Sequence, residues 1–320
     1  MEKTKYTFLV PAYKGQYFQE ALLSIKNQTY KNFKVLVSDD CSPENLEETF
    51  QRTVGNDSRF SFRRNIENMG SKNLVSHWNL LIDMCDSEYL IMASDDDIYD
   101  EQFLEQMNKL VVRYPTVDLF RSKVKKITAK GELFLEDPPM NEFDTHTDFL
   151  YQTYNCPRIQ CIANYLFKTI PLKKKGKFVD FPLAWFSDDA TTIICAENGV
   201  CNTTDFLFSF RDSGINISND SITDHKRALK KTIATIAFYN WFVIYFNNKK
   251  TDANILDDIK WKKIHNGVRE RVYIVLICNY LQLSFREFKK LLRWMDCNSF
   301  FSRKIQRFTF IYEWLKSSLL

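Results

Sequence analysis

The sequence predicts an α/β fold in which a mainly parallel sheet is flanked by helices, followed by a helical C-terminal region. Short apolar runs alternate with segments of helical period in the first third of the chain, and the residues from 220 onward read as helices. The composition, 45% hydrophobic and 26% charged over 320 residues, is that of a globular protein that can bury a core. Eight Gly and eight Pro exclude a collagen-like or low-complexity chain.

The elements follow one another in strand–helix order. Phe18, Ala21, Leu22 and Ile25 recur at helical spacing. Ser42-Pro43 predicts the start of another helix, because a capping residue is followed by a proline suited to the first turn. The expected strands cover Tyr6–Val10, Lys34–Val37 and Tyr89–Ala93, and the expected helices cover Tyr17–Gln28, Asn45–Arg52, Asn73–Cys85 and Glu101–Arg113. This alternation is typical of a parallel sheet covered on both faces.

The chain is expected to divide near residue 219. Residues 1–115 form the strand–helix half, residues 116–219 have more antiparallel character, and residues 220–320 are basic and rich in aromatics. The net charge is −6 over residues 1–219 and +10 over residues 220–320. The basic region either contacts an anionic surface or an acidic partner, or its positive charge balances the negative charge of residues 1–219 within the same folded molecule.

The sequence also favours a cytoplasmic location. The first apolar run is too short for a signal peptide, and no run reaches the length of a membrane-spanning helix. The eight cysteines show no CxxC pair and no metal-finger spacing, so we expect reduced thiols.

Three polar clusters follow predicted strands: Pro11-Ala12-Tyr13, Asp39-Asp40 and Asp95-Asp96-Asp97. In parallel sheets ligands bind beyond the carboxyl ends of the strands, so these clusters are expected to border one crevice. No Gly-x-Gly-x-x-Gly follows the first strand and no Walker A motif is present, which argues against a dinucleotide site of the usual kind.

The three consecutive aspartates allow two interpretations. They could cap the helix that begins near Glu101, because acidic residues favour helix N-termini. Alternatively, a few carboxylates could hold Mg²⁺ or Mn²⁺ while substrate phosphates complete the coordination shell. Asp39-Asp40 at another strand end favours the metal site, since two acidic clusters would then meet.

Six segments resemble family 2 glycosyltransferases, which have the GT-A fold. The opening strand Thr7–Tyr13 is similar to that of the family. The other segments are Ser24–Phe33, Val37–Ser42, Ala93–Tyr99, Phe186–Gly199 and Phe210–Ser218, which resemble the S-x-x-x-Q-T-Y-x-N-F, nucleoside, D-x-D, catalytic-base and Y-R-x-H-x-x-S-x-S segments. Ser213 stands where many members have His, which puts the number of protein ligands to the metal in question.

The resemblance implies roles for individual residues in a GT-A domain spanning 1–219. Residues 1–115 would bind the nucleotide sugar and residues 116–219 would face the acceptor. Lys72 after Gly70 could contact the diphosphate, although a Gly-containing turn explains it almost as well. The donor-side roles are base and ribose for Pro11, Ala12 and Tyr13, the base imide for Asp40, ribose or sugar for Asp95, metal for Asp96, and metal or sugar for Asp97.

Asp189 would be the general base that deprotonates the acceptor hydroxyl, with Asp188 as the alternative. Without the upstream motifs, these two residues would read as a cap for the helix at 190–197.

The expected function is inverting, metal-assisted transfer of a sugar from a UDP-sugar to a saccharide or lipid-linked saccharide in bacterial surface polysaccharide synthesis. One alternative is a non-catalytic protein that keeps the fold as a nucleotide-sugar-binding or scaffold module. Another is a nucleotidyltransferase, but the Gly-rich loop that it needs after the first strand is missing. No nucleic-acid partner is expected.

Residues 226–246 and 268–316 mix Lys and Arg with aromatics. Such helices could lie in the interface of an anionic bilayer, on the inner face of the plasma membrane. The alternative is that they pack on each other or on a second subunit in a homodimer. The aromatics concerned are Trp241, Phe242, Phe285, Phe288, Trp294, Phe300, Phe301, Phe308 and Trp314.

Overall fold

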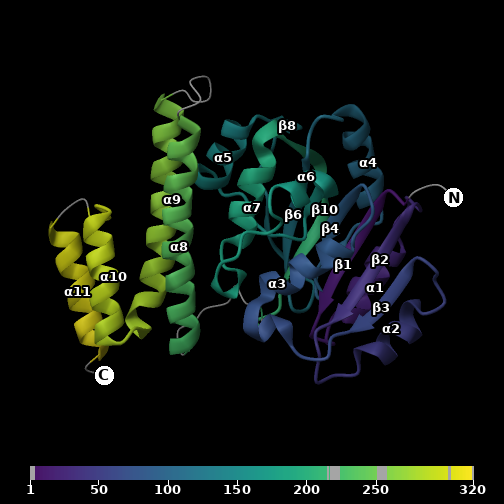
Figure 1. The fold of residues 1–320 in the computed structure, drawn as a ribbon, viewed down its shortest axis with the longest axis horizontal. Helices are drawn as coiled ribbons and strands as arrows, with labels where there is room; N and C mark the ends of the chain where they lie inside the picture. The colour runs from purple at the N-terminus through teal and green to yellow at the C-terminus, as the bar shows by residue number, and fades with distance from the viewer. Residues whose placement is uncertain (1–3, 215, 217–223, 251–257, 302–303, 319–320) are drawn as a thin grey trace. The chain divides into compact units, whose positions relative to one another are not determined.

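The structure, a computed structural model, describes residues 4–214, 216, 224–250, 258–301 and 304–318. The chain divides into two compact units (Figure 1). The first unit holds the described residues through Asp180 together with Ser187–Asn216, and the second holds Phe181–Phe186 together with the described residues from 224 onward. The first unit is α/β and the second is helical, so the predicted fold class is confirmed.

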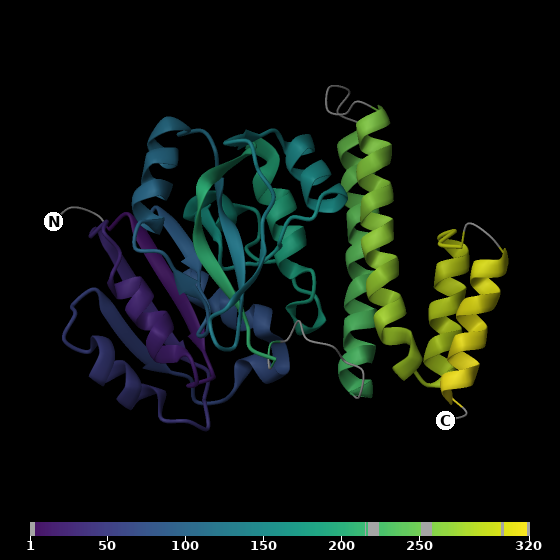
Figure 2. The ribbon, with the colours of Figure 1, turned by 180° about the vertical axis from the view of Figure 1, so that it is seen from behind.

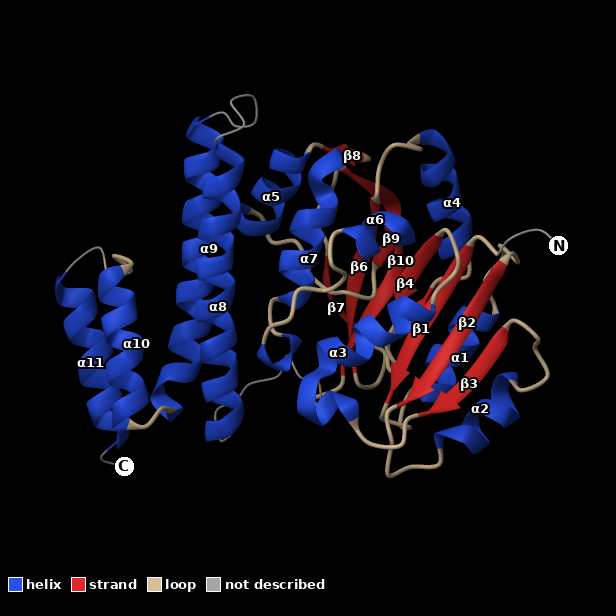
Figure 3. Ribbon diagram, viewed as in Figure 1, coloured by secondary structure: helices blue, strands red, loops and turns tan. Residues whose placement is uncertain are grey.

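Within the described residues, ten strands of the first unit form one sheet, shown in red in Figure 3. The main path has the order β3-β2-β1-β4-β9-β6-β10-β5, with β7 beside β6 and β8 beside β10. The strands are β1 (Tyr6–Ala12), β2 (Phe33–Asp39), β3 (Phe60–Arg64), β4 (Tyr89–Met92), β5 (Ile98–Tyr99), β6 (Leu119–Thr128), β7 (Leu133–Glu136), β8 (Phe143–Asp144), β9 (Tyr165–Lys168) and β10 (Val200–Asp212). Neighbours from β3 to β4 are parallel, whereas β9 is antiparallel to both of its neighbours.

The helices of the first unit cover both faces of the sheet (Figures 1 and 2). They are α1 (Phe18–Lys26), α2 (Leu46–Val54), α3 (Met69–Met84), α4 (Phe103–Arg113), α5 (His146–Asn155), α6 (Thr169–Lys174) and α7 (Ser187–Cys195), with the short helix η2 (Ala196–Asn198). Tyr6, Phe8 and Val10 alternate along β1 and share one core with apolar residues of α1, α2 and α4. Helix α3 lies on the opposite face.

Two local features differ from the sequence expectation. Strand β3 was not expected, because Phe60-Ser61-Phe62-Arg63-Arg64 is half polar; it is the edge strand, so its outer side needs no apolar partner. Helix α3 begins at Met69 but is interrupted at Asn73 (φ −155°, ψ 104°). The Asn73 side chain accepts a hydrogen bond from Ser76 N at 2.9 Å, so the expected helix from Asn73 is the second part of α3.

The second unit is built on aromatic packing. Its helices are η1 (Pro182–Ala184), α8 (His225–Lys250), α9 (Asp258–Asn279), η3 (Tyr280–Gln282), α10 (Phe285–Cys297) and α11 (Lys304–Ser318). Phe186 stacks on Phe238 of α8 with ring centroids 4.4 Å apart, and Phe288 of α10 stacks on Trp314 of α11, also at 4.4 Å. Ordinary packing therefore accounts for Phe238, Phe288 and Trp314, which are buried.

Other aromatics of this unit face solvent. Phe285 is 65% exposed and Phe308 is 69% exposed, so burial in the helical core does not account for these two residues. A search of the described residues for a helix long and apolar enough to cross a bilayer finds none.

Candidate active site

The three polar clusters of the sequence meet at the carboxyl ends of β2, β1 and β4, which are neighbours in the sheet. The backbone of Tyr13 connects the two acidic clusters. Its N–H donates to Asp95 Oδ2 at 2.7 Å, and its carbonyl accepts a hydrogen bond from Ser42 Oγ at 2.6 Å. Ala12 accepts from the Asp40 N–H at 2.8 Å, while Pro11 precedes it in the same strand. The expected juxtaposition at this sheet edge is therefore observed.

At the end of β2 the carboxylates are tied to protein donors. Asp39 accepts from Ser42 N at 2.8 Å and forms an ion pair with Arg64. Asp40 accepts from Met69 N at 2.9 Å and from Gly70 N at 2.7 Å, so its carboxylate binds the first turn of α3. A Cβ at Gly70 would lie 2.9 Å from Asp40 Oδ2, which makes glycine the residue that allows this approach.

A buried polar group supports the same strand end. His77 Nε2 lies 2.9 Å from Ser38 Oγ and 3.2 Å from Asn65 Nδ2, and Asn65 donates to Asp40 Oδ1 at 2.8 Å. Burial lowers the pKa of His77, although the nearby Asp40 charge acts in the opposite direction. His77 is therefore a neutral core histidine that supports the residues that position Asp40.

At the end of β4 the three carboxylates are buried but only partly compensated. Asp95 accepts from Tyr13 N and from Lys14 N at 2.8 Å, and Asp96 Oδ2 lies 3.2 Å from Lys14 Nζ. Asp97 accepts from Ser94 Oγ and from Arg211 N. Burial, followed by the charge of Asp96, raises the pKa of Asp95 to about 6 and that of Asp97 to about 8. The cluster thus carries more negative charge than its surroundings neutralise.

Arg211 of β10 holds this acidic loop, a role that the sequence did not reveal. Its N–H donates to Asp97 Oδ1 at 2.8 Å and its Nε donates to the Asp96 carbonyl at 3.0 Å. The guanidinium also pairs with Glu20 at 2.6 Å and lies 4.3 Å from the Tyr17 ring centroid. The sequence feature that could have indicated this role is an arginine that follows the aromatic residues of the strand. No sequence feature indicated that Lys14 would lie beside Asp96.

Asp188 and Asp189 lie in the first turn of α7. Asp189 is 3% exposed, and its Oδ1 accepts a hydrogen bond from Tyr154 OH of α5 at 3.3 Å. Asp188 Oδ1 accepts from Asp189 N at 3.0 Å, and both carboxylates lie in the first turn, where acidic side chains interact favourably with the helix dipole. Sequence reasoning missed Tyr154, since a tyrosine in an amphipathic helix looks like ordinary core.

Carboxylates of both acidic groups affect the buried thiol of Cys161. Burial raises the pKa of the Cys161 thiol well above its usual range, and the negative charges of Asp97, Asp188 and Asp96 raise it further. The carboxylates after β4 and Asp188 at the start of α7 therefore contribute to the charge around the same buried residue.

Two other expected positions lie at the margin of this site. Lys72 is exposed and pairs with Glu67 at 2.6 Å. Ser213, at the position where many relatives have His, donates from both its N–H and its hydroxyl to Asn216 Oδ1, at 2.9 and 2.6 Å. Ser213 thus belongs to a turn that follows β10.

The residues at the end of β4 fit a divalent cation that is shared with a substrate. No group of three or more His, Cys, Asp or Glu side chains in the described part of the chain is arranged to hold a metal by itself. The Asp96 carboxylate lies beside one ammonium group, that of Lys14, and between the carboxylates of Asp95 and Asp97 in the sequence. Mg²⁺ commonly uses one or two carboxylates together with substrate phosphates, which matches this donor set.

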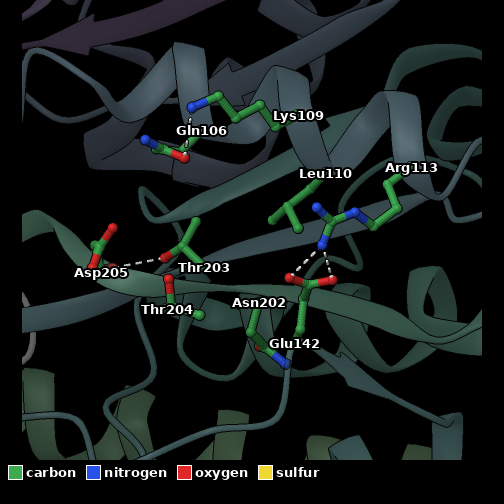
Figure 4. Close-up of a pocket in the computed structure, with 9 residues that line it drawn as sticks. All are labelled: Gln106, Lys109, Leu110, Arg113, Glu142, Asn202, Thr203, Thr204 and Asp205. Atoms are coloured by element: carbon green, nitrogen blue, oxygen red, sulfur yellow. Dashed lines mark hydrogen bonds and ion pairs between the residues drawn. The ribbon is translucent and has the colours of Figure 1, made fainter.

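A separate hollow of about 80 Å³ lies elsewhere in the first unit (Figure 4). Arg113 and Glu142 form an ion pair of 2.6 Å at one side of it, and Thr203 lies at the other. It is lined by α4 and the first part of β10, whereas Asp97 contacts the last part of β10. The hollow is therefore not the site described above.

Comparison with known proteins agrees with this geometry. Residues 7–163 match the family model described as glycosyl transferase family 2. Residues 7–163 thus have the sequence pattern of this family, and the protein is a glycosyltransferase. Among curated protein sequences none matches the chain.

Solved structures show the same fold. TarS residues 1–349 from S. aureus, in complex with UDP-GlcNAc, have a TM-score of 0.65 and 14% identity, over 91% of this chain and 79% of that chain. The mannosyltransferase PcManGT from Pyrobaculum calidifontis, in complex with GDP-Man and Mn²⁺, has a TM-score of 0.53 and 14% identity, over 99% and 86% of the two chains. The expected GT-A fold is thereby confirmed.

Proposed function

We propose that this protein transfers a sugar from a UDP-sugar to a hydroxyl of a saccharide or lipid-linked saccharide, with inversion and with metal assistance. The observation that carries the proposal is the buried acidic loop Asp95–Asp97, held by Arg211 and by the β1 loop. The structures of TarS with UDP-GlcNAc and of PcManGT with GDP-Man and Mn²⁺ support the proposal that this protein uses a nucleotide sugar as donor and a divalent metal.

The donor would lie along the three strand ends. Pro11, Ala12 and Tyr13 would contact base and ribose, Asp40 would accept from the imide of the base, and Asp95 would contact ribose or sugar. Asp40 is oriented for this by α3, and Asp95 by the N–H groups of Tyr13 and Lys14. Lys72 would reach the diphosphate after leaving Glu67.

Asp96 would hold Mg²⁺ or Mn²⁺, with Asp97 as a second ligand or as a partner of the sugar hydroxyls. When bound, the cation would stabilise the negative charge that develops on the departing diphosphate. Lys14 lies 3.2 Å from Asp96 and is placed to add positive charge at the same point.

Asp189 would serve as the general base, with Asp188 as the alternative. The acceptor oxygen attacks the anomeric carbon from the face opposite the diphosphate, its proton passes to the carboxylate, and the carbon–oxygen bond breaks with its electron pair on the phosphate. One displacement inverts the configuration. Tyr154, which donates to Asp189 at 3.3 Å, would fix the orientation of the base.

The proposed setting is bacterial surface polysaccharide synthesis at the cytoplasmic face of the membrane. None of the eight cysteines forms a disulfide, which supports a reducing compartment. A screen of UDP- and GDP-sugars for thermal stabilisation with and without Mn²⁺, followed by transfer assays with the stabilising donor, tests the function. Stabilisation by one donor without any turnover or hydrolysis would favour the non-catalytic binding module instead.

A further inference from the structure

Lys14, which follows the end of β1, contacts the acidic loop through both its backbone and its side chain. Its N–H donates to Asp95 Oδ2 at 2.8 Å, and its Nζ lies 3.2 Å from Asp96 Oδ2. Within the described part of the chain, Asp96 pairs with no other cation. Lys14 therefore supplies the positive charge that Asp96 meets in the folded protein.

The two partners of this ion pair differ in their freedom to move. The Lys14 side chain is 30% exposed, whereas that of Asp96 is 7% exposed. A lysine ammonium sits on a flexible stem and has three rotatable donors, so Nζ can turn from Asp96 toward a bound ligand. Asp96 cannot follow it, because the Arg211 Nε donates to the Asp96 carbonyl at 3.0 Å and holds the loop. Lys14 is thus the movable partner.

The Asp96 carboxylate needs a counter-charge when Lys14 leaves. The charge of Asp96 acts with burial to raise the pKa of both Asp95 and Asp97, so the three carboxyl groups repel one another. A buried carboxylate that loses its only cationic partner is strongly destabilised. Departure of Lys14 therefore requires that another cation take its place at Asp96.

We propose that Lys14 is an exchangeable counter-ion: it holds Asp96 in the donor-free protein and moves to the donor's diphosphate when a divalent cation binds at Asp96. This inference rests on the proposed function, which assigns the cation to Asp96 and a nucleoside diphosphate to the strand ends. An ammonium and a divalent cation compete for one carboxylate, because their charges repel at contact distance. The diphosphate gives Lys14 a new anionic partner.

A consequence is that Lys14 couples the binding of metal and donor. The metal alone must displace the ammonium into water, whereas with the donor present the ammonium has a phosphate to bind. Each ligand therefore favours the state in which Lys14 has left Asp96, and each should raise the affinity for the other.

The test measures Mn²⁺ binding by the full-length protein, using the electron paramagnetic resonance signal of free Mn²⁺, without nucleotide and with saturating UDP, or GDP if UDP does not bind. For the wild type, the nucleotide should lower the Kd for Mn²⁺ at least about tenfold. Lys14→Met removes the competing charge, so without nucleotide it should bind Mn²⁺ about tenfold or more tighter than the wild type. With nucleotide it should bind Mn²⁺ no tighter than the wild type.

Two further variants separate this role from a general loss of charge. Lys34→Met makes the same change at an exposed lysine near the start of β2, and its Kd values should stay within about twofold of the wild type. Lys14→Arg keeps a cation beside Asp96 and should restore the weak Mn²⁺ binding of the nucleotide-free wild type to within about threefold. Urea midpoints verify that all three variants are folded.

The inference is overturned if nucleotide-free Lys14→Met binds Mn²⁺ no tighter than the wild type, or if Lys34→Met tightens binding equally. It is also overturned if the wild type binds no Mn²⁺ even with nucleotide. Sugar transfer in the presence of a chelator would then show that the protein is still a transferase, so the two failures are distinguishable. Conversely, the expected Mn²⁺ affinities without any sugar transfer would support the role of Lys14 and contradict the proposed function.

Discussion

The acidic residues after β2 and those after β4 look alike in the sequence but have different surroundings. Asp39 and Asp40 are matched by an arginine, an asparagine and three backbone N–H groups, which tie β2 to β3 and to the start of α3. The cluster at Asp95–Asp97 also accepts from three backbone N–H groups and from Ser94, but it has one ammonium for three carboxylates, and burial raises the pKa of two of them.

This difference indicates which cluster is scaffold and which is poised for a charged ligand. A carboxylate with all its neighbours satisfied stabilises the fold, and changing it should cost stability. A carboxylate close to other carboxylates is destabilised by their charge repulsion in the folded state. Changing it should therefore lower activity rather than stability. Variants of the two clusters should therefore differ in whether they lose activity or stability.

The largest effect is expected for Asp96→Ala. Transfer should fall about a thousandfold or more, because the proposed metal ligand is lost. The midpoint of urea unfolding should stay the same or rise, since the repulsion on Asp95 and Asp97 is relieved. Asp86→Ala, an exposed acid before β4, is the control. Full Mn²⁺-dependent donor binding by Asp96→Ala would rule out the ligand role.

Asp189→Asn should lower the rate of transfer about a hundredfold to a thousandfold with little change in donor affinity. The amide keeps the shape of the side chain but cannot accept the acceptor's proton. Single-turnover rates and calorimetric donor binding distinguish the two effects. If Asp188→Asn is inactive while Asp189→Asn is near normal, the base is Asp188.

Arg211→Lys should lower kcat about tenfold to a hundredfold by loosening the acidic loop, because lysine cannot reproduce both the bond to the Asp96 carbonyl and the stacking on Tyr17. Arg64→Lys, the matched change at the partner of Asp39, should alter kcat less than about threefold. The comparison uses kcat and the Mn²⁺ concentration for half-maximal rate. If kcat falls equally in both variants and their stability falls in parallel, Arg211 supports only the fold and does not position the acidic loop for catalysis.

Asp40→Asn should destabilise the fold by about 1–3 kcal/mol, since an amide cannot accept from both Asn65 and the N–H groups of Met69 and Gly70. Urea unfolding measures this, with Asp86→Asn as the control. Loss of donor affinity is also expected, because Asp40 is proposed to contact the base, so the stability measurement decides: an Asp40→Asn variant that unfolds at the wild-type midpoint would show that Asp40 is not part of the scaffold.

The smallest effect is a pH dependence of stability from His77. Burial lowers its pKa in the native state, so below pH ~6.5 the unfolded chain takes up a proton that the native state does not. Stability should therefore fall as the pH drops from 7 to 5.5, by at most about 1.4 kcal/mol per unit. Urea midpoints across this range should show a shallower slope for His77→Gln than for the wild type.

The sequence by itself determined the strand–helix alternation, the positions of the acidic clusters and the family resemblance. These features are local, because periodicity and motif spacing depend on neighbouring residues. They sufficed to predict that Tyr13, Asp40 and Asp95 would come together, since in a parallel sheet the strand ends share one edge.

Only the tertiary structure decided which groups balance those charges and which aromatics are core. Arg211 is more than a hundred residues from Asp97, and Tyr154 reaches Asp189 from another helix. On α11, Trp314 is buried and Phe308 is exposed, although both are aromatics in a basic helix. Such outcomes depend on which face of each element meets a partner distant in the sequence, and no local pattern specifies that partner.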